Sequence, residues 1–499
     1  MSKNQIKKQV KDHFLYEFLN PESITIFGAN NEFVGTMGAM MLRNIIAGGF
    51  PTDKIFPIHP ELGEIQGLKA YKNVLDVPKT PDLAHIILRP DIVPQVLEEC
   101  GQKGIKKAII TSGGFREVGN EQLFDRIMEI SKKYEIRFIG PNCLGIYNAW
   151  YKYPDFQKKS FNTMWIYETP ERGNISIIAH SGTIASHIFW RCKEIGVKIG
   201  KSFSIGNEDD IDLVDCLQYL KEDPETEVIG LYIEEIKRGK EFIELAKQIT
   251  PKKPIVAIYA GGTAAATRSI MGHTGAIAGE DKIFEAVFQE TGVISTFFIK
   301  DFMYFLRTFS SGIFPKGKRL GIITDSGGCG AMMAKTAEKF GLVVPEISEE
   351  LKSKLKDYVP DVANIDNPLD LTFSFSMHDK YIRIPKLMIK SGEVDGIVMY
   401  AAWGVREVLD IVRKSGGEIP EFFEQMTNNV MNKSFLQPMQ KIARRKSFPI
   451  FYICPQGYSN DWARVFMKEN IPIFDLWDYP IKCFDVIAKY SEFCGKISK

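Results

Sequence analysis

The stretch of this sequence best suited to chemistry holds a single histidine. His273 lies within RSIMGHTGAIAG, residues 268–279, among glycines and mostly small side chains. The stretch follows a strand-like run at 254–259 and precedes a helix-like run at Asp281–Thr291. Because glycines let the backbone approach a ligand closely, a histidine here can act as a base, a nucleophile or a metal ligand. A loop histidine without chemistry is the alternative.

Two other groups could act on the same ligand. The run EVIGLYIEE at 227–235 predicts a strand that ends in two carboxylates, Glu234 and Glu235. Since the carboxyl ends of parallel strands face the ligand crevice, one of them could meet His273, and a solvated acidic loop is the alternative. The turn SGT at 181–183 stands at a predicted helix start, where free N–H groups and hydroxyls suit a phosphoryl group. An ordinary helix cap explains the same three residues.

The elements that must position these residues follow one local pattern. An apolar strand, a glycine-containing turn and a helix are predicted at Ser23–Leu42, Asn174–Trp190 and Arg319–Lys335. Strand-like and helix-like segments alternate along nearly the whole chain, which is typical of α/β domains with parallel sheets. A length of 499 residues favours about three domains. We therefore place domain beginnings near residues 20, 173 and 318.

The first of these turns could hold a nucleotide-like ligand. Gly28, Gly35 and Gly38 would let a phosphate approach a helix N-terminus, although their spacing is longer than GxGxxG. The second strand runs into IHPE at 58–61 without an acidic residue that clearly ends it, whereas a nicotinamide dinucleotide site prefers one there. A turn needed only for packing is the alternative. The strands of this domain are predicted at Ile55–Ile58, Ala84–Leu88, Lys107–Thr111 and Arg137–Ile139.

Composition argues against several classes of protein. A net charge of +1 gives no argument for nucleic-acid or membrane-surface binding. The polar stretch MSKNQIKKQVKDHF and the lack of a long apolar run predict neither a signal peptide nor a membrane span. The eight cysteines form no C-x-x-C pair, which argues against a zinc site and a disulfide framework. We expect a cytoplasmic protein with reduced thiols and no metal site.

Two more segments bear on ligand binding. Residues 146–171 are rich in aromatic side chains, whereas a simple linker would be more polar. These aromatic side chains should pack either on a domain face or on a ligand. Near the third domain beginning, DSGGCG at 325–330 predicts a further anion-receptive turn, and NIDNPLDLT at 364–372 predicts a polar loop because of Pro368.

Nine short motifs follow one another along the chain. They are GANN (28–31), GLKAY (67–71), SGGFRE (112–117), GPNCLG (140–145), SGT (181–183), SIGNE (204–208), LYIE (231–234), GHTGAIAG (272–279) and NPLDLT (367–372). This ordered set resembles the nucleoside-diphosphate-forming acyl-CoA synthetases of the succinyl-CoA synthetase superfamily, over roughly residues 18–490. The similarity is to the α subunit, the CoA-binding and phosphohistidine-bearing chain, of the ADP-forming acetate–CoA ligases.

The resemblance implies an α/β fold with three domains. A Rossmann-like CoA-binding domain would take residues 1–150, and an aromatic-rich linker would take residues 151–172. Two flavodoxin-like domains with parallel sheets would follow. The phosphohistidine loop would belong to residues 173–315, and residues 316–499 would form a C-terminal ligase domain.

The resemblance also implies roles for individual residues. His273 inherits the place of the transiently phosphorylated histidine, and Glu234 that of the glutamate that binds its ring. A carboxylate on one ring nitrogen would fix the tautomer and stabilise the charge that develops as the other nitrogen attacks phosphorus. The turn that holds the phosphoryl oxygens falls on Ser181, Gly182 and Thr183. CoA contacts are implied for Gly28, Ala29, Asn30, Gly35, Ser112, Gly113, Asn142 and Cys143.

The implied reaction interconverts a carboxylic acid, CoA and ATP with acyl-CoA, ADP and phosphate, through an acyl phosphate and a phosphohistidine. The sequence shows no ATP-grasp module, so the resemblance implies a hetero-oligomer with a separate ATP-grasp β subunit that binds ATP or ADP with Mg2+. Two alternatives are a CoA- or acyl-CoA-binding regulator without turnover and a nicotinamide-dependent enzyme or redox sensor. A regulator has no need of the full His273, Glu234 and SGT set, and the second alternative lacks the ribose-binding acid.

The chain departs from the family pattern at several positions. Tyr259 stands where the family has a lysine, and residues 261–263 lack the family's basic residue. His180 replaces the glutamine of SQSG, and Glu61 replaces the lysine of NPK, with Arg89 as a compensating cation. Together with the aromatic segment, these changes predict a carboxylic acid that is larger than acetate, or aromatic.

Overall fold

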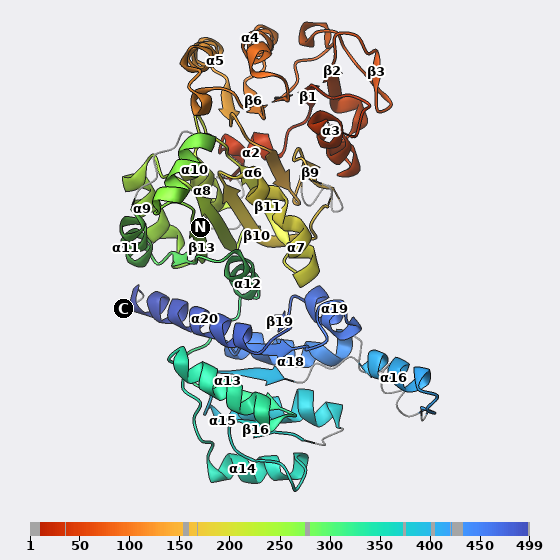
Figure 1. Cartoon of the computed structure of the whole chain (residues 1–499), viewed down its shortest axis with the longest axis vertical. Coiled ribbons are helices and arrows are strands. Elements are labelled where there is room, and N and C mark those ends of the chain that lie inside the picture. Colours follow the sequence, from red (N-terminus) through yellow and green to blue (C-terminus); the bar gives the residue numbers. More distant parts are fainter. Residues whose placement is uncertain are drawn as a thin grey trace. The chain divides into compact units, whose positions relative to one another are not determined.

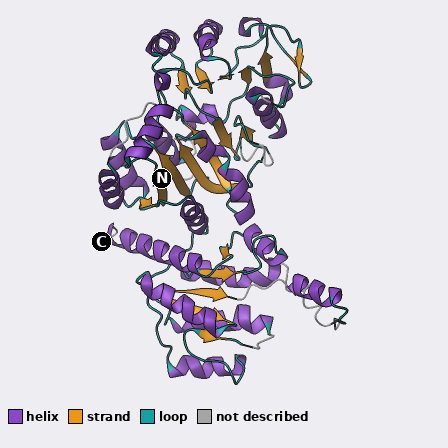
Figure 2. Ribbon diagram, viewed as in Figure 1, coloured by secondary structure: helices purple, strands orange, loops and turns teal. Residues whose placement is uncertain are grey.

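The computed structural model describes residues 10–34, 36–152, 159–166, 168–274, 280–372, 376–400, 405–419, 421 and 433–497. The chain divides into two compact units, residues 1–193 with 197–302 and residues 194–196 with 303–499. The first unit holds two large sheets and the second unit holds one (Figure 1). In each sheet the strands are accompanied by helices (Figure 2).

The first sheet consists of short apolar runs that are buried on both faces, as is usual for parallel strands. Its order is β2-β1-β5-β6-β7, and all its strand pairs are parallel. The strands are β1 (Ile24–Phe27), β2 (Ile55–Ile58), β5 (Leu83–Ile86), β6 (Lys107–Ile110) and β7 (Arg137–Ile139). They are accompanied by α2 (Leu15–Leu19), α3 (Met37–Ala47), α4 (Val93–Lys103), α5 (Glu121–Tyr134) and a hairpin of β3 (Glu64–Ile65) and β4 (Leu68–Lys69).

The second sheet has the order β14-β13-β12-β10-β11-β8-β9. Its parallel strands are β10 (Arg172–Ala179), β11 (Ile199–Ser204), β12 (Val228–Ile233), β13 (Ile255–Tyr259) and β14 (Ile294–Ser295), and β8 (Gly145–Asn148) and β9 (Phe161–Asn162) are antiparallel. Its helices are α6 (Gly182–Ser186), α7 (Ile188–Ile195), α8 (Leu213–Glu222), α9 (Gly239–Ile249), α10 (Ala264–Thr274) and α11 (Asp281–Thr291). One apolar core continues from the first sheet into the second.

The aromatic-rich segment contributes to this second sheet. Strand β8 pairs with β11, and β9 pairs with β8. The Tyr147 hydroxyl donates to the Pro170 carbonyl (3.1 Å), and Trp150 Nε1 donates to the Gly173 carbonyl (2.8 Å). The Tyr151 hydroxyl donates to the Pro21 carbonyl (2.9 Å). Of the two alternatives for this segment, the aromatic side chains at 147, 150 and 151 therefore show packing on the protein. The domain boundaries at 150 and 172 stay a prediction.

The third sheet is again parallel, with the order β16-β15-β17-β18-β19. Its strands are β15 (Leu320–Thr324), β16 (Leu369–Asp370), β17 (Gly396–Tyr400), β18 (Ile450–Ile453) and β19 (Ile473–Phe474). The helices of this region are α12 (Ile299–Ser310), α13 (Gly327–Lys339), α14 (Glu349–Leu355), α15 (Ile384–Ser391), α16 (Val405–Lys414), α18 (Lys433–Lys446), α19 (Asp461–Lys468) and α20 (Asp478–Ile497), with a π-helical turn η6 at Asp379–Arg383.

The parallel strands of all three sheets share one topology. Numbered by their occurrence within each sheet, they follow the order 2-1-3-4-5, in which a ligand crevice opens beyond the carboxyl ends of strands 1 and 3. The α/β fold with parallel sheets is therefore confirmed. The strands at Ile55–Ile58 and Arg137–Ile139 and the helix at Asp281–Thr291 are confirmed with their bounds.

Two sequence predictions about local structure are wrong. The segment 364–372, expected to be a polar loop, contains the edge strand β16 directly after Pro368, because the proline lies outside the paired residues. Residues 268–274, expected to belong to a loop, form the second half of α10. The physical reason is the composition before His273, since three alanines at 264–266 and the side chains of Arg268 and Met271 all favour helix, and Gly272 alone opposes it. Separately, no helix among the described residues is both long and apolar enough to cross a membrane.

Candidate functional site

The turn after β1 lies at the crevice of the first sheet. Gly28 has φ +85°, and a Cβ there would stand 2.0 Å from the carbonyl oxygen of Ile87, so only glycine fits. Ala29 is fully buried. The Asn30 side-chain oxygen accepts from the Glu32 N–H (2.8 Å) and the Thr36 hydroxyl (3.1 Å), which orders the turn before α3. The predicted CoA residues at 28–30 thus stand together, and Gly35 lies outside the described residues.

A second group of predicted CoA residues meets at the carboxyl ends of β6 and β7. The Ser112 hydroxyl donates to the Leu88 carbonyl (2.6 Å), and the Asn142 N–H donates to the Ser112 carbonyl (2.9 Å). A Cβ on Gly113 would lie 3.1 Å from the Asn142 side-chain oxygen. Cys143 differs from these residues, because its thiol is buried and donates to the Ile110 carbonyl, and burial raises its pKa to about 12. Any CoA contact at this position would come from the backbone.

The GPNCLG segment is enclosed by loops of the second sheet. A Cβ on Gly182 would stand 2.4 Å from Leu144 Cγ, so the SGT turn packs directly on this segment. The Asn142 side-chain amide donates to the Asn207 side-chain oxygen (3.2 Å), and the Asn207 amide donates to Glu117 (2.7 Å). The carboxyl edges of the first and second sheets therefore meet, and the predicted CoA residues at 112–113 and 142 lie beside the predicted phosphate turn.

The SGT turn itself begins a short helix. Ser181 is the N-cap of α6, and its hydroxyl accepts from the Ile184 N–H at 3.4 Å. Thr183 is exposed. α6 ends at Ser186 and is followed by α7, with His187 between them. The helix-cap interpretation of Ser181 is thus confirmed, and binding of a phosphoryl group here stays a prediction.

Glu234 is buried directly after β12, and a second histidine lies beside it. His180 Nδ1 is 3.4 Å from the Glu234 backbone nitrogen and 3.2 Å from the Tyr232 carbonyl oxygen. His180 Nε2 is 3.0 Å from Glu208 Oε1, and both side chains are almost fully buried. Burial alone would lower the pKa of His180, but the Glu208 carboxylate, the Tyr232 carbonyl and the Glu234 carboxylate raise it to about 9.

The helix that carries His273 lies against the first sheet's loops. α10 contacts η4, the 3-10 turn at Arg116–Val118 that ends the SGGFRE motif. His273 occupies the last turn of α10, and its side chain and residues 275–279 lie outside what is described. The expected contact between His273 and Glu234 therefore stays a prediction. Tyr259 stacks on Phe284 of α11 with ring centroids 3.6 Å apart, so a packing aromatic takes the place of the family's lysine.

Sequence reasoning missed the residues that join these loops. Glu117, Asn207 and Glu208 stood within the quoted motifs SGGFRE and SIGNE but received no role. For Asn207 and Glu208 the signal was a polar residue in the loop that follows a buried strand, the same signal that identified Glu234, whereas Glu117 lies in η4 and carried no such signal. Among the described residues, no group of three or more His, Cys, Asp or Glu could hold a metal ion.

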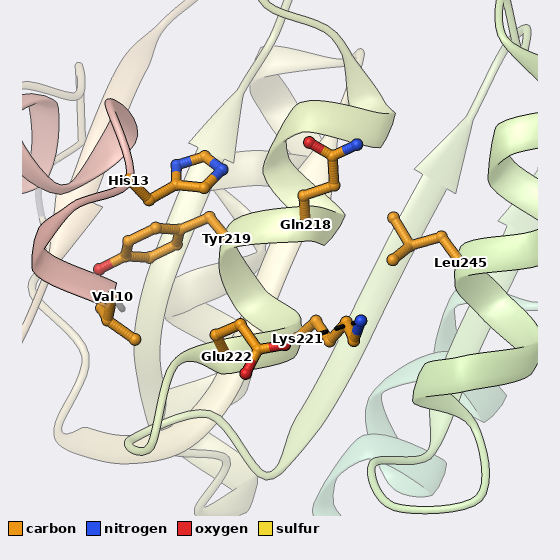
Figure 3. A pocket seen from close by; sticks show the side chains of 7 residues that line it. All are labelled: Val10, His13, Gln218, Tyr219, Lys221, Glu222 and Leu245. Carbon is orange, nitrogen blue, oxygen red and sulfur yellow. Dashed lines mark ion pairs between the residues drawn. The ribbon is translucent and has the colours of Figure 1, made fainter. Parts of the chain in front are cut away.

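One cavity of about 220 Å³ lies elsewhere in the first unit. It is formed by Val10, His13, Leu245 and residues from the last turns of α8, and Figure 3 shows the Lys221–Glu222 ion pair (3.6 Å) beside it. The His13 ring stacks on Phe14 and meets Tyr219 edge-on. None of the quoted motifs contributes to this cavity, so it is not part of the candidate site.

Known proteins resemble this chain in both sequence and fold. Family models match for a CoA binding domain at residues 22–149 and for a succinyl-CoA ligase like flavodoxin domain at residues 172–309. The chain is 32% identical over 463 residues to acetate–CoA ligase (ADP-forming) II subunit α of Pyrococcus furiosus, covering 92% of this chain and 94% of that one. The chain belongs to the α-subunit family of the ADP-forming acyl-CoA ligases.

Some relatives in this ligase family are longer chains. The acetate–CoA ligase (ADP-forming) of Methanocaldococcus jannaschii is 38% identical over 361 residues, which cover 72% of this chain and 49% of that protein. The chain thus spans about half the length of this relative. Among solved structures, an acetyl-CoA synthetase 1 of Ca. Korarchaeum cryptofilum, in complex with phosphate and ADP, matches with a TM-score of 0.78 and 26% identity, covering 97% of this chain and 98% of that one.

Proposed function

We propose that this chain is the CoA-binding, phosphohistidine-bearing subunit of an ADP-forming acyl-CoA ligase. Such a ligase interconverts a carboxylic acid, CoA and ATP with an acyl-CoA, ADP and phosphate. The observation that carries the proposal is the junction of the first two sheets, where Leu144 packs on Gly182 and Asn142 bonds to Asn207. A CoA site at one edge and a phosphate turn at the other would face each other across this junction.

His273 carries the phosphoryl group in this proposal, and Glu234 orients its ring. Phosphoryl transfer depends mainly on positioning and on neutralisation of charge. Because the Ser181 hydroxyl caps α6, the phosphoryl oxygens would be held chiefly by the backbone N–H groups of Ser181, Gly182 and Thr183 and by the Thr183 hydroxyl. The position of α10 against η4 supports this role, since it keeps the helix of His273 beside the other motifs.

CoA would be held at the carboxyl edge of the first sheet. The residues that fit it are Gly28, Ala29, Asn30, Ser112, Gly113 and Asn142, with the backbone at Cys143 and with Gly35 as a further expected contact. The fit rests on the position of these residues at the carboxyl ends of β1, β6 and β7, where the glycines at 28 and 113 let the neighbouring loops pack closely together. When bound, CoA supplies the thiol that takes up the acyl group.

We also propose that a separate ATP-grasp subunit completes the enzyme and binds ATP or ADP with Mg2+. Two observations support it: the Pyrococcus furiosus relative is a subunit α, and the Methanocaldococcus jannaschii relative is about twice as long as the matched region. A cytoplasmic location is supported by the eight cysteines, all of which are free thiols.

The substrate is proposed to be a carboxylic acid larger than acetate. A 4-hydroxybutyrate–CoA ligase (ADP-forming) of Nitrosopumilus maritimus is 32% identical to this chain over 357 residues, which cover 71% of this chain and 50% of that protein. Tyr147, Trp150 and Tyr151 pack on the protein, so these side chains do not themselves argue for an aromatic acid, which stays the second candidate for the substrate. Acyl-CoA formation measured across acetate, hydroxy, branched, aromatic and dicarboxylic acids tests the proposal, and a preference for acetate would rule it out.

Labelling tests the proposed reaction itself. The purified chain and its ATP-grasp subunit are incubated with γ-labelled ATP, and we expect an acid-labile, base-stable label on the chain. His273→Ala should lose that label completely, because the substituted side chain has no nucleophilic nitrogen. A chain that binds CoA but never takes up label would instead be the CoA-binding regulator.

A further inference from the structure

A buried histidine joins three loops of the second sheet at their carboxyl ends. His180 follows β10, Glu208 lies in the loop after β11, and Glu234 follows β12. The ring nitrogens of His180 lie 3.0 Å from Glu208 Oε1 and 3.4 Å from the Glu234 backbone nitrogen. His180 is also the residue directly before Ser181, the cap of the predicted phosphate turn. Its ring is buried away from solvent.

The loop after β11 is itself held in place by several bonds. Glu208 Oε1 accepts from the Leu213 N–H (3.0 Å), and Lys237 Nζ donates to the carbonyls of Asn207 (2.6 Å) and Glu208 (2.8 Å). Glu208 Oε2 is buried and has no hydrogen-bond partner among the described residues. The carboxylate is thus fixed where it faces His180, and a charged imidazole balances it inside the protein.

The charged groups around His180 come from the loops after β11 and β12. Glu208, Glu234 and Glu235 are the acidic groups that interact with it, and Lys237, 3.8 Å from Glu235, is the nearby base. Burial lowers the pKa of His180, but the acidic groups and the Tyr232 carbonyl outweigh burial and raise it to about 9. At neutral pH the ring therefore carries a positive charge beside the Ser181–Thr183 turn.

We propose that His180, paired with Glu208, is a positioning residue: its Nδ1–H donates to the Tyr232 carbonyl and its ring holds Glu208, so it ties the loops after β10, β11 and β12 together beside the Ser181–Thr183 turn and Glu234. This inference rests on the proposed function, since the anion it serves is the phosphoryl group. Because Glu208 balances the charge of the imidazolium, the pair acts on the phosphoryl group by holding the Ser181–Thr183 turn and Glu234 in place, not by adding net charge. His180 does not touch the reacting atoms in this proposal.

The test compares Glu208→Gln and His180→Gln with the unsubstituted chain, each assembled with the ATP-grasp subunit. Labelling of His273 from γ-labelled ATP and the KM for inorganic phosphate are measured from pH 6 to pH 10. In the unsubstituted chain we expect labelling to fall as the pH rises through about 9. In Glu208→Gln the fall should move to a pH at least about one unit lower, because an opposite charge that raised the pKa has been removed.

The KM for phosphate distinguishes an electrostatic role of His180 from a packing role. At pH 8 we expect Glu208→Gln to raise it at least about threefold, and the increase should shrink as the pH is lowered, because a larger share of the rings is protonated. His180→Gln should raise it throughout this pH range and abolish the fall near pH 9. A packing role alone would give an increase that does not depend on pH.

A matched control is the buried pair of Lys201 and Asp223 at the amino end of the same sheet. Lys201 Nζ donates to Asp223 Oδ2 (2.7 Å), and both side chains are as buried as those of His180 and Glu208. Asp223→Asn breaks a buried pair without touching the phosphate turn, so the fall near pH 9 should stay in place.

Three outcomes would contradict either this inference or the proposed function. A Glu208→Gln profile that still falls near pH 9 would overturn the inference, and so would an unchanged phosphate KM in His180→Gln. Absence of label from the unsubstituted chain would overturn the proposed function instead, which keeps the two failures distinct.

Discussion

The first residues of the turns after β10 and β15 carry opposite charges, although the two turns occupy the same place in sheets of the same topology. Both follow strand 1 of a 2-1-3-4-5 parallel sheet and lead through glycines into a helix. After β10 the turn residue is a buried cation, His180, and the anion Glu208 comes from a neighbouring loop. After β15 the turn residue is the anion Asp325, and the cation Lys380 comes from the π-helical turn η6, with its Nζ 2.7 Å from Asp325 Oδ2.

This difference shows that the glycine turn determines how closely strand and helix pack but does not determine the local charge. The glycines allow the strand and helix to come close in both sheets, but the buried partner of the turn residue sets the local charge. After β10 the charge of His180 is balanced by Glu208, so this pair adds no net charge at the SGT turn. At α13, Asp325 is neutralised by Lys380, and the side chain adds no net positive charge to the turn. We therefore expect the two turns to respond differently to substitution and to pH.

The largest effect should come from breaking the charge pair of the third sheet. Lys380→Met leaves Asp325 without its buried cation, and loss of one partner of such a pair typically costs about 3–5 kcal/mol of stability. Urea unfolding followed by a probe in the third sheet measures the loss. Lys386→Met is the control, because Lys386 is an exposed lysine on the nearby helix α15. Equal losses in both variants would show that the pair does not hold Asp325 in place.

A smaller effect should appear in the stability of the second sheet, which should depend on pH. The folded-state pKa of His180, about 9, lies above its ordinary value of 6.5. Its contribution to stability is therefore fully present below pH 6.5 and is lost as the pH rises through 9, an upper limit of about 3 kcal/mol. For Lys380, burial lowers the folded-state pKa despite Asp325, so its contribution has the opposite sign.

Urea midpoints of the first unit at pH 6.5 and pH 9.5 measure this dependence. His180→Gln should flatten it, because glutamine does not titrate. If the urea midpoint changes with pH equally in the substituted and the unsubstituted chain, groups other than His180 cause the change. The two turns would then not differ in their electrostatics.

The smallest effects should come from the glycines of the two turns. Gly182→Ala places a methyl group 2.4 Å from Leu144 Cγ, and such overpacking typically costs about 1–3 kcal/mol. Gly328→Ala in α13 meets no atom within 4 Å, so it should stabilise that helix by about 0.5–1 kcal/mol. Thermal unfolding of both variants checks the order. A neutral Gly182→Ala would show that Leu144 moves aside easily.

Local structure was largely predictable from the sequence, because an apolar run between turn residues has few other solutions. The strands at 55–58 and 137–139 and the helix at 281–291 illustrate this. Residues 268–274 were harder to predict, since the glycines at 272 and 275 favoured a loop and outweighed the alanines that begin α10. The strands β8 and β9 were not predicted, because the pairing of β8 with β11 depends on residues about 50–60 positions away.

By itself the sequence determined the elements, the glycine turns and the ordered motifs, because these depend on neighbouring residues and on backbone freedom. Only the tertiary structure decided which side chains of those motifs act together. His180 is charged because the loops after β11 and β12 bring Glu208 and Glu234 to it, and burial raises the pKa of the Cys143 thiol because Ile110 and its neighbours enclose it. Burial and the approach of distant charges set these properties, and neither can be read from the spacing of residues along a chain.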